Sequence, residues 1–102
     1  MPGGLFAINR EYFTAIGMYD PGLKIWGGEN FELSYKLWMC GGRILFVPCS
    51  RAGHIYRLPE WHGNDKPVQG NNISVTLINY MRVVEVWWDD WKKVFSQRKS
   101  HI

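Results

Sequence analysis

The 102-residue chain lacks any apolar run that approaches the length needed to cross a membrane, since a spanning helix takes roughly 20 such residues. It also lacks a basic start followed by an apolar stretch, so we expect any targeting segment to lie elsewhere. Neither an internal repeat nor a low-complexity segment is present. A chain of this length is expected to form one small domain with one core, or to contribute to a larger core.

Cysteine is scarce, because only Cys40 and Cys49 are present. The two could pair with each other, stay reduced or pair with cysteines outside the chain, and their spacing does not decide between these states. A structural zinc site needs four ligands. Two cysteines with one well-placed histidine do not supply them, so the sequence does not predict such a site.

Charge of one sign is also largely missing: the net charge is +3, and basic residues are interleaved with acidic ones along most of the chain. The exception is a basic cluster near the C-terminus, formed by Lys92, Lys93, Arg98 and Lys99. Such a cluster is more typical of a solvated helix end than of a nucleic-acid site. A small nucleic-acid-binding module remains an alternative that salt-dependent binding to DNA or RNA would reveal.

The residues that are present predict an α/β unit. The chain is 46% hydrophobic and 16% aromatic, which excludes a disordered polypeptide. An apolar run predicts a strand over residues 3–9, and Asn9 is a typical N-cap for a short helix over residues 10–16. Gly17 fits the left-handed position after a helix. The stretch "YDPG" then predicts a tight turn in which Gly22 takes a positive φ.

The middle of the chain predicts a helix followed by a strand. Two apolar rows at helical spacing cover residues 31–40, and a pair of glycines ends the helix. The stretch "RILFVP", residues 43–48, predicts a short strand. Cys40 would close the helix and Cys49 would follow the strand, whose six residues span about 20 Å. That separation is beyond the reach of a disulfide, so we expect no bond between these two cysteines.

The last third of the chain predicts a loop and one long helix. Residues 58–72 carry prolines, glycines and polar groups, and so long a loop in a small domain is typical of a functional or disordered segment. From Ser74 to residue 96, apolar residues repeat at alternating spacings of four and three: Leu77, Met81, Val84, Trp88, Trp91 and Phe95. We interpret this row as core packing.

The stretch "IWGGEN", residues 25–30, is the strongest candidate for a ligand site. Two glycines just before a helix start would let a ligand reach the backbone N–H groups. Glu29 and Asn30 would lie in the first turn, and Trp26 could supply a flat apolar face. A carboxylate, an amide and an indole suit a sugar. The alternative interpretation is a tight turn in which Glu29 only favours the helix dipole.

A second candidate is His54, which would follow the end of a strand, where ligands bind in α/β sheets. A histidine at such a position can be a metal ligand, a base or an ordinary polar group. Arg51 and Arg57 flank it and could face phosphates, because arginine pairs with them through two hydrogen bonds. Ordinary surface charge is the alternative for both arginines.

Three stretches carry a resemblance to a known family: "GGLFAINREYF", "YDPGLKIWGGENFELSYKLWMCGGRILFVPCSRAGHIYR" and "RVVEVWWDDWKKVF". They resemble the C-terminal half of the catalytic domain of polypeptide N-acetylgalactosaminyltransferases, over nearly the whole chain. The resemblance implies a partial glycosyltransferase domain of the GT-A α/β type. The reaction implied moves GalNAc from UDP-GalNAc to a Ser or Thr hydroxyl of a peptide or a GalNAc-glycopeptide, with retention at the anomeric carbon. It also implies a Golgi-lumenal, type II membrane protein when full length.

The resemblance also implies roles for individual residues. His54 matches the third protein ligand of a Mn²⁺ ion that holds the UDP diphosphate, and such an ion would act as a Lewis acid on the departing UDP. Glu29 and Asn30 would hold the sugar beside the acceptor, with Trp26 nearby. The other residues implied to line the substrate site are Gly3, Gly4, Gly27, Gly28 and Arg57. Residues 58–72 would form a lid over the donor.

One departure from the family pattern is that the chain holds no Asp-x-His motif to supply the other two metal ligands. By the resemblance, the nucleotide-binding half, the membrane anchor and the lectin domain are absent, and the two cysteines pair with partners outside this stretch. We therefore expect the isolated chain to be inactive. An inactive paralogue that binds glycopeptide is the alternative. Asn72 begins a glycosylation sequon whose occupancy is a further hypothesis.

Overall fold

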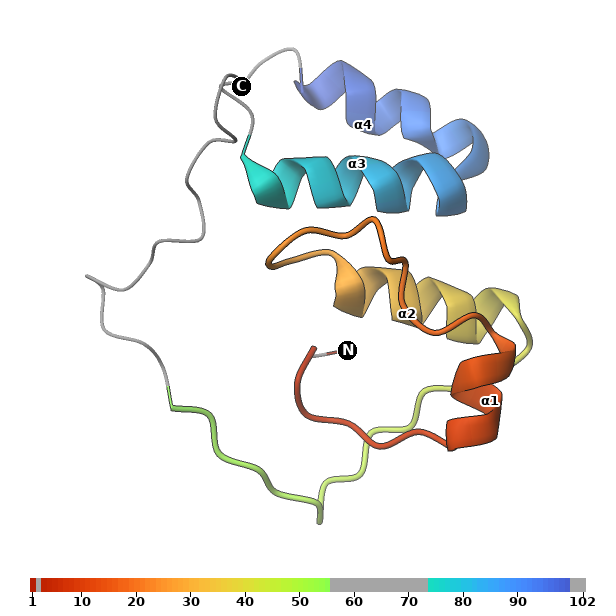
Figure 1. Cartoon of the computed structure of the whole chain (residues 1–102), viewed down its shortest axis with the longest axis vertical. Coiled ribbons are helices and arrows are strands. Elements are labelled where there is room, and N and C mark those ends of the chain that lie inside the picture. The colour runs from red at the N-terminus through yellow and green to blue at the C-terminus, as the bar shows by residue number, and fades with distance from the viewer. Residues whose placement is uncertain (2, 56–73, 100–102) are drawn as a thin grey trace.

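A computed structural model describes residues 1, 3–55 and 74–99 of the chain. Four α-helices follow one another in these residues: α1 (Arg10–Ala15), α2 (Glu29–Met39), α3 (Val75–Trp87) and α4 (Lys92–Lys99), with a 3₁₀ turn, η2 (Asp89–Trp91), between the last two. Helix α3 lies between α2 and α4, and α1 lies beside the C-terminal end of α2 (Figure 1). None of the described helices is both long enough and apolar enough to cross a membrane.

The strands expected at residues 3–9 and 43–48 are wrong for the described chain. Apart from one isolated bridge residue, Ser74, residues 1, 3–55 and 74–99 contain no strand. A strand forms only where a second strand satisfies its backbone N–H and C=O groups, and no described segment pairs with either run. Phe46 is 90% exposed as a result. The described part of the fold is therefore helical, and it does not show the α/β architecture expected from the sequence.

The single helix expected over residues 74–96 is also wrong, because it is broken into α3 and α4. The chain turns at Asp89, which takes a left-handed φ of 44°. Aspartate tolerates this conformation better than most residues, and acidic side chains are unfavourable at a helix C-terminus. The turn lets Phe95 pack edge-on against Trp88, with 6.2 Å between ring centroids. Lys92 reaches back across the break to Glu85, with 2.6 Å between Nζ and Oε1.

The helix ends expected from local signals are confirmed. The Asn9 side chain accepts a hydrogen bond from the backbone N–H of Tyr12 at 2.8 Å, which caps α1, and Gly17 follows that helix with a φ of 87°. Helix α2 begins at Glu29 and ends before Gly41, whose φ is 77°. The N–H of Gly42 then donates to the carbonyl of Leu37 at 2.7 Å, which is the bond of a Schellman motif.

The core is small and lies between α2 and α3. Its buried apolar side chains are Leu33, Leu37, Val75, Val83 and Val84. Of the two apolar rows on α2, only the row of Leu33 and Leu37 is buried, whereas Phe31 and Trp38 of the other row are exposed. Phe31 instead packs edge-on against Tyr80 of α3. The two helices are thus held together by a narrow apolar contact with aromatic rings along one side.

An ion pair joins the turn before α2 to α3. Asp20 accepts two hydrogen bonds from the guanidinium of Arg82, at 2.8 and 3.0 Å. Gly22 follows in the turn, where its N–H donates to Asp20 Oδ1 at 2.8 Å. The positive φ expected at Gly22 is wrong, since Gly22 is not among the positive-φ glycines. A Cβ on Gly22 would meet the Arg82 guanidinium, so a side chain at this position would require the flexible end of Arg82 to move.

Candidate functional site

The glycine pair before α2 adopts a backbone geometry that favours glycine. Gly27 and Gly28 have φ angles of 91° and 95°, which side chains other than glycine rarely adopt. Both residues are buried. Gly28 is the N-cap residue of α2, and its carbonyl accepts a hydrogen bond from the N–H of Glu32 at 2.9 Å. Gly27 and Gly28 therefore form the junction between the preceding loop and the start of α2.

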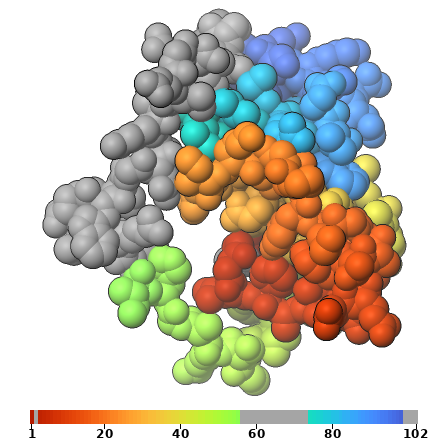
Figure 2. Space-filling model, viewed as in Figure 1, coloured from red at the N-terminus to blue at the C-terminus, as the bar shows by residue number. Residues whose placement is uncertain are grey.

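Helix α3 occupies the space that the missing side chains leave. A Cβ on Gly27 would lie 3.1 Å from Cγ2 of Thr76, and a Cβ on Gly28 would lie 3.1 Å from Cβ of Asn79. Figure 2 shows this orange loop in contact with the cyan start of α3. The close approach that requires two glycines is thus that of α3. Contact between a sugar and the backbone of these glycines stays a prediction.

Asn79 holds the loop from the α3 side. Its side chain is 0% exposed. Its Oδ1 accepts from the N–H of Lys24 at 2.8 Å, and its Nδ2 donates to the carbonyls of Lys24, Trp26 and Gly27 at 2.7, 3.0 and 2.7 Å. The sequence analysis missed this residue. Its signal was a carboxamide within the apolar stretch "VTLINYM" of a helix, and a buried amide must find hydrogen-bond partners.

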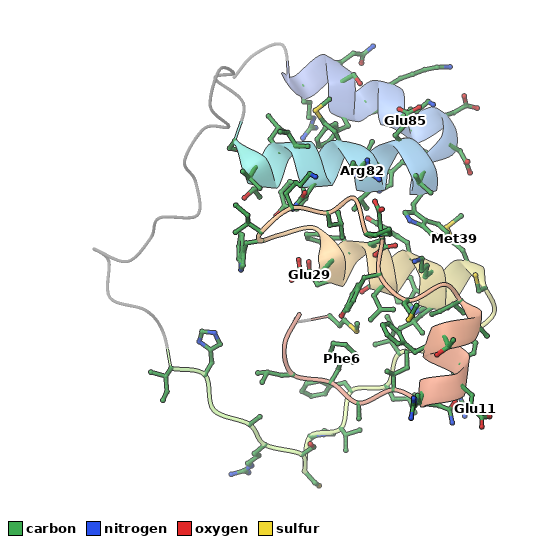
Figure 3. All side chains as sticks on the ribbon, in the orientation of Figure 1. Phe6, Glu11, Glu29, Met39, Arg82 and Glu85 are labelled. Carbon is green, nitrogen blue, oxygen red and sulfur yellow. The ribbon has the colours of Figure 1, made fainter. Side chains whose placement is uncertain are left out.

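The first turn of α2 brings three of the predicted site residues together. A Cβ on Gly3 would lie 2.7 Å from Glu29 Oε1 and 3.6 Å from Asn30 Cβ. The Asn30 amide donates to the carbonyl of Met1 at 3.2 Å. Figure 3 shows Glu29 at the start of α2, above the N-terminal segment that carries Phe6. Gly4 has no atom of another described segment within 4 Å of its Cβ position, so it lies in open space beside this group.

The Glu29 carboxylate is half-buried, and among the residues that the structure describes no hydrogen bond or ion pair joins it to another side chain. Glu32, one turn further along α2, differs. It is 3% exposed, pairs with Lys36 at 2.6 Å and accepts from the N–H of Asp20 at 3.2 Å. Burial, together with the charges of Glu29 and Glu32, raises the pKa of the nearby Tyr19 hydroxyl. Glu29 is thus a carboxylate available to an external hydrogen-bond donor.

Trp26 lies at the exposed tip of the loop. Its side chain is 55% exposed, while its carbonyl is held by Asn79. Ile25 beside it is also exposed and has a φ of 31°. An exposed indole on a fixed backbone offers a flat apolar face, and its contact with a ligand stays a prediction.

His54 lies in an irregular, exposed stretch at residues 51–55, rather than after a strand. In Figure 2 this green segment runs away from the helices and leaves an open space beside the N-terminal segment. Among the described residues, no three His, Cys, Asp or Glu side chains cluster closely enough to hold a metal ion. Mn²⁺ prefers carboxylate, carbonyl and water oxygens, so the His54 imidazole would be one ligand beside several oxygen donors.

Several sequence-based expectations cannot be placed. Arg57, Asn72 and the loop over residues 58–72 lie outside the described residues. Arg51 is exposed. Cys40 and Cys49 are exposed and unbonded.

Comparison with known proteins gives consistent matches. A family model described as the N-terminal domain of galactosyltransferase matches residues 1–62. The chain is 66% identical to N-acetylgalactosaminyltransferase 7 of Homo sapiens, over 93% of this chain and 14% of the human protein. It is 56% identical to N-acetylgalactosaminyltransferase 7 of Drosophila melanogaster, over 98% of this chain and 17% of that protein. Polypeptide N-acetylgalactosaminyltransferase 5 of Mus musculus is 48% identical over 100% of this chain and 10% of its own length.

The chain therefore spans about one seventh of the length of the human relative that it matches, since the coverage of that protein is 14%. No solved structure gives a significant match.

Proposed function

The chain belongs to the polypeptide N-acetylgalactosaminyltransferase family of glycosyltransferases, and from this membership we propose that it holds the sugar of UDP-GalNAc beside a Ser or Thr acceptor. The full reaction would be retaining transfer of GalNAc, as in mucin-type O-glycosylation. The names of the relatives support GalNAc as the transferred sugar. The Golgi lumen as the site of action, and membrane attachment through a segment outside this chain, belong to the same proposal.

The observation that carries the proposal is the half-buried Glu29 carboxylate, which lies against Gly3, with Asn30 next to the same glycine. A carboxylate accepts hydrogen bonds from sugar hydroxyls, and such charge-assisted bonds are roughly twice as strong as neutral ones. Because Gly3 has no side chain, the N-terminal segment leaves the Glu29 carboxylate accessible to a ligand. Glu29 would therefore orient the sugar, and Asn30 would support the same edge through its amide.

Trp26 and His54 would act on other parts of the substrate. The exposed indole would cover the apolar C–H face of a sugar ring. The His54 imidazole would contribute one ligand to Mn²⁺, which when bound neutralises charge on the departing UDP. Further ligands would come from residues that this chain does not supply, so the chain by itself is expected to be inactive.

The test replaces the matching segment of the human relative with this chain and measures transfer of GalNAc from UDP-GalNAc to a Ser/Thr peptide and to a GalNAc-glycopeptide. We expect the chimera to transfer and the 102-residue chain alone not to do so. Glu29→Gln in the chimera keeps the size and removes the charge. It should lower kcat/KM by the order of 10²-fold, as the loss of one preorganised polar contact does in other enzymes.

Glu11→Gln is the matched control, because Glu11 is the first-turn acid of α1 and lies far from Glu29 in Figure 3. It should leave transfer unchanged. Wild-type efficiency of Glu29→Gln would reduce Glu29 to a residue that only favours the helix dipole. A chimera that binds the glycopeptide but transfers nothing would favour the alternative, an inactive glycopeptide-binding module.

A further inference from the structure

We propose that Asn79 is a positioning residue for the sugar site, because its buried side chain fixes the loop that sets the start of α2. The inference rests on the proposed function, since it concerns the same Glu29 carboxylate. Asn79 itself lies on α3, its side chain binds backbone groups of the loop, and it is not expected to touch the substrate.

The loop at residues 24–28 has one backbone–backbone hydrogen bond among the described residues, which the Gly28 carbonyl accepts from the N–H of Glu32 at the start of α2. None of its N–H groups donates to a backbone carbonyl of the described residues. Its carbonyls at Lys24, Trp26 and Gly27 and its N–H at Lys24 are all bound by Asn79. A carboxamide has only two N–H hydrogens, so three carbonyls share them. One side chain thus satisfies four backbone groups that would otherwise need water.

The backbone of this loop would not keep its conformation without such a partner. Ile25, Gly27 and Gly28 all have positive φ angles, at 31°, 91° and 95°. A non-glycine residue in this region is strained and persists only when the surroundings hold it. Asn79 supplies that hold next to Ile25, because it binds the carbonyls of the residues on either side of it, Lys24 and Trp26.

The consequence for the site follows from the connection between loop and helix. Gly28 is both the last residue of the loop and the N-cap of α2, and Glu29 is the first residue of the helix. A change in the direction of the loop therefore turns the first turn of α2 and moves the Glu29 carboxylate relative to Gly3. A displacement of about 1 Å in a positioned group can cost of the order of 10²-fold in rate.

The test compares Asn79→Ala with two variants on the same helix. Val83→Ala removes a buried core side chain that lies one turn further along α3, so it lowers stability without touching the loop. Thr76→Val keeps a methyl group against Gly27 and removes a buried hydroxyl for which no hydrogen-bond partner is found. Asn79→Asp keeps the acceptor for the Lys24 N–H but replaces the donor that serves three carbonyls.

All four changes are made in the transfer-competent chimera, and kcat, KM for UDP-GalNAc and the melting temperature are measured together. Below their melting temperatures, we expect Asn79→Ala and Asn79→Asp to lower kcat at least 10-fold, and Val83→Ala and Thr76→Val to keep kcat within 2-fold. In the 102-residue chain, Asn79→Ala should also shift the amide NMR signals of Gly27, Gly28 and Glu29, whereas Val83→Ala should not.

Two outcomes would overturn the positioning role while leaving the proposed function in place. One is a kcat for Asn79→Ala equal to that of Val83→Ala at matched stability, and the other is unshifted signals at Gly27, Gly28 and Glu29. Failure of the unmodified chimera to transfer GalNAc would instead reject the proposed function, whatever the Asn79 variants show.

Discussion

The substitution Gly28→Ala tests how tightly the loop before α2 packs on α3. Gly28 has a φ of 95°, and the new Cβ would lie 3.1 Å from Cβ and 3.5 Å from the carbonyl carbon of Asn79. These atoms are fixed by the α3 backbone and cannot rotate away. The left-handed backbone costs an alanine about 1–2 kcal/mol, and overpacking adds about 1–3 kcal/mol. We expect a loss of about 2–5 kcal/mol in the free energy of unfolding.

Gly17→Ala is the matched control, because Gly17 has a similar φ of 87° but nothing within 4 Å of its Cβ position. It carries only the backbone strain, about 1–2 kcal/mol, and the effect of alanine on the unfolded chain is common to both variants. Gly4→Ala is the reference variant for the change in unfolding free energy, because Gly4 has neither a positive φ nor a close neighbour. The assay is urea unfolding followed by tryptophan fluorescence. Equal destabilisation by Gly28→Ala and Gly17→Ala would show that the contact with Asn79 does not require glycine.

Two further predictions concern the ion pair and the cysteines. The hydrogen bond from Arg82 is the main cause that lowers the pKa of the Asp20 carboxyl, and burial opposes it. A lowered folded-state pKa adds stability that is fully present above the ordinary value of about 3.9 and is lost as the pH falls through the folded value. The difference in unfolding free energy between the parent and Arg82→Gln should therefore shrink below about pH 4, and a constant difference from pH 7 to 3 would contradict this. For Cys40 and Cys49, non-reducing peptide mapping should recover no peptide that joins them, and recovery of one would refute the expectation.

Local signals in the sequence predicted the helix ends well. Asn9 caps α1, Gly17 follows it, Gly41 ends α2 and Ser74 starts α3 through a hydrogen bond to the N–H of Leu77 at 3.2 Å. Each of these features depends on residues three to five positions apart. The physical cause is therefore contained in the stretch of sequence that carries the signal.

Features that depend on distant segments were not predictable in the same way. An apolar run such as residues 43–48 becomes a strand only if a partner strand lies beside it. The row of apolar residues over 74–96 has helical spacing throughout, and that spacing contains no sign that the packing of Phe95 on Trp88 would favour a turn. Asp20 and Arg82 are 62 positions apart, so the sequence around each residue does not indicate that they pair.

The candidate site was predictable only in part, because it depends both on local sequence and on a distant residue. The stretch "IWGGEN" singled out Glu29, Asn30 and the glycine pair as a candidate ligand site, and in the structure Glu29 and Asn30 lie next to Gly3. What the stretch does not contain is the reason why its backbone keeps this shape. That reason is Asn79, which is 52 to 55 positions away in the sequence and binds the backbone of the loop from Lys24 to Gly27.

The contacts that Asn79 and α3 make with the loop affect how the glycine pair of "IWGGEN" is interpreted. A glycine pair before a helix start is commonly explained by a ligand that must reach the backbone, and here the Cβ directions of both glycines face α3 instead. Packing against α3 and access for a ligand can both apply to this loop. One side of the loop faces α3, and its tip presents the exposed indole of Trp26. Since the carboxamide of Asn79 binds the loop backbone on the α3 side, we infer that the proposed functional unit is "IWGGEN" together with that distant asparagine. Retention of the six-residue stretch without the carboxamide should preserve the carboxylate but not its position.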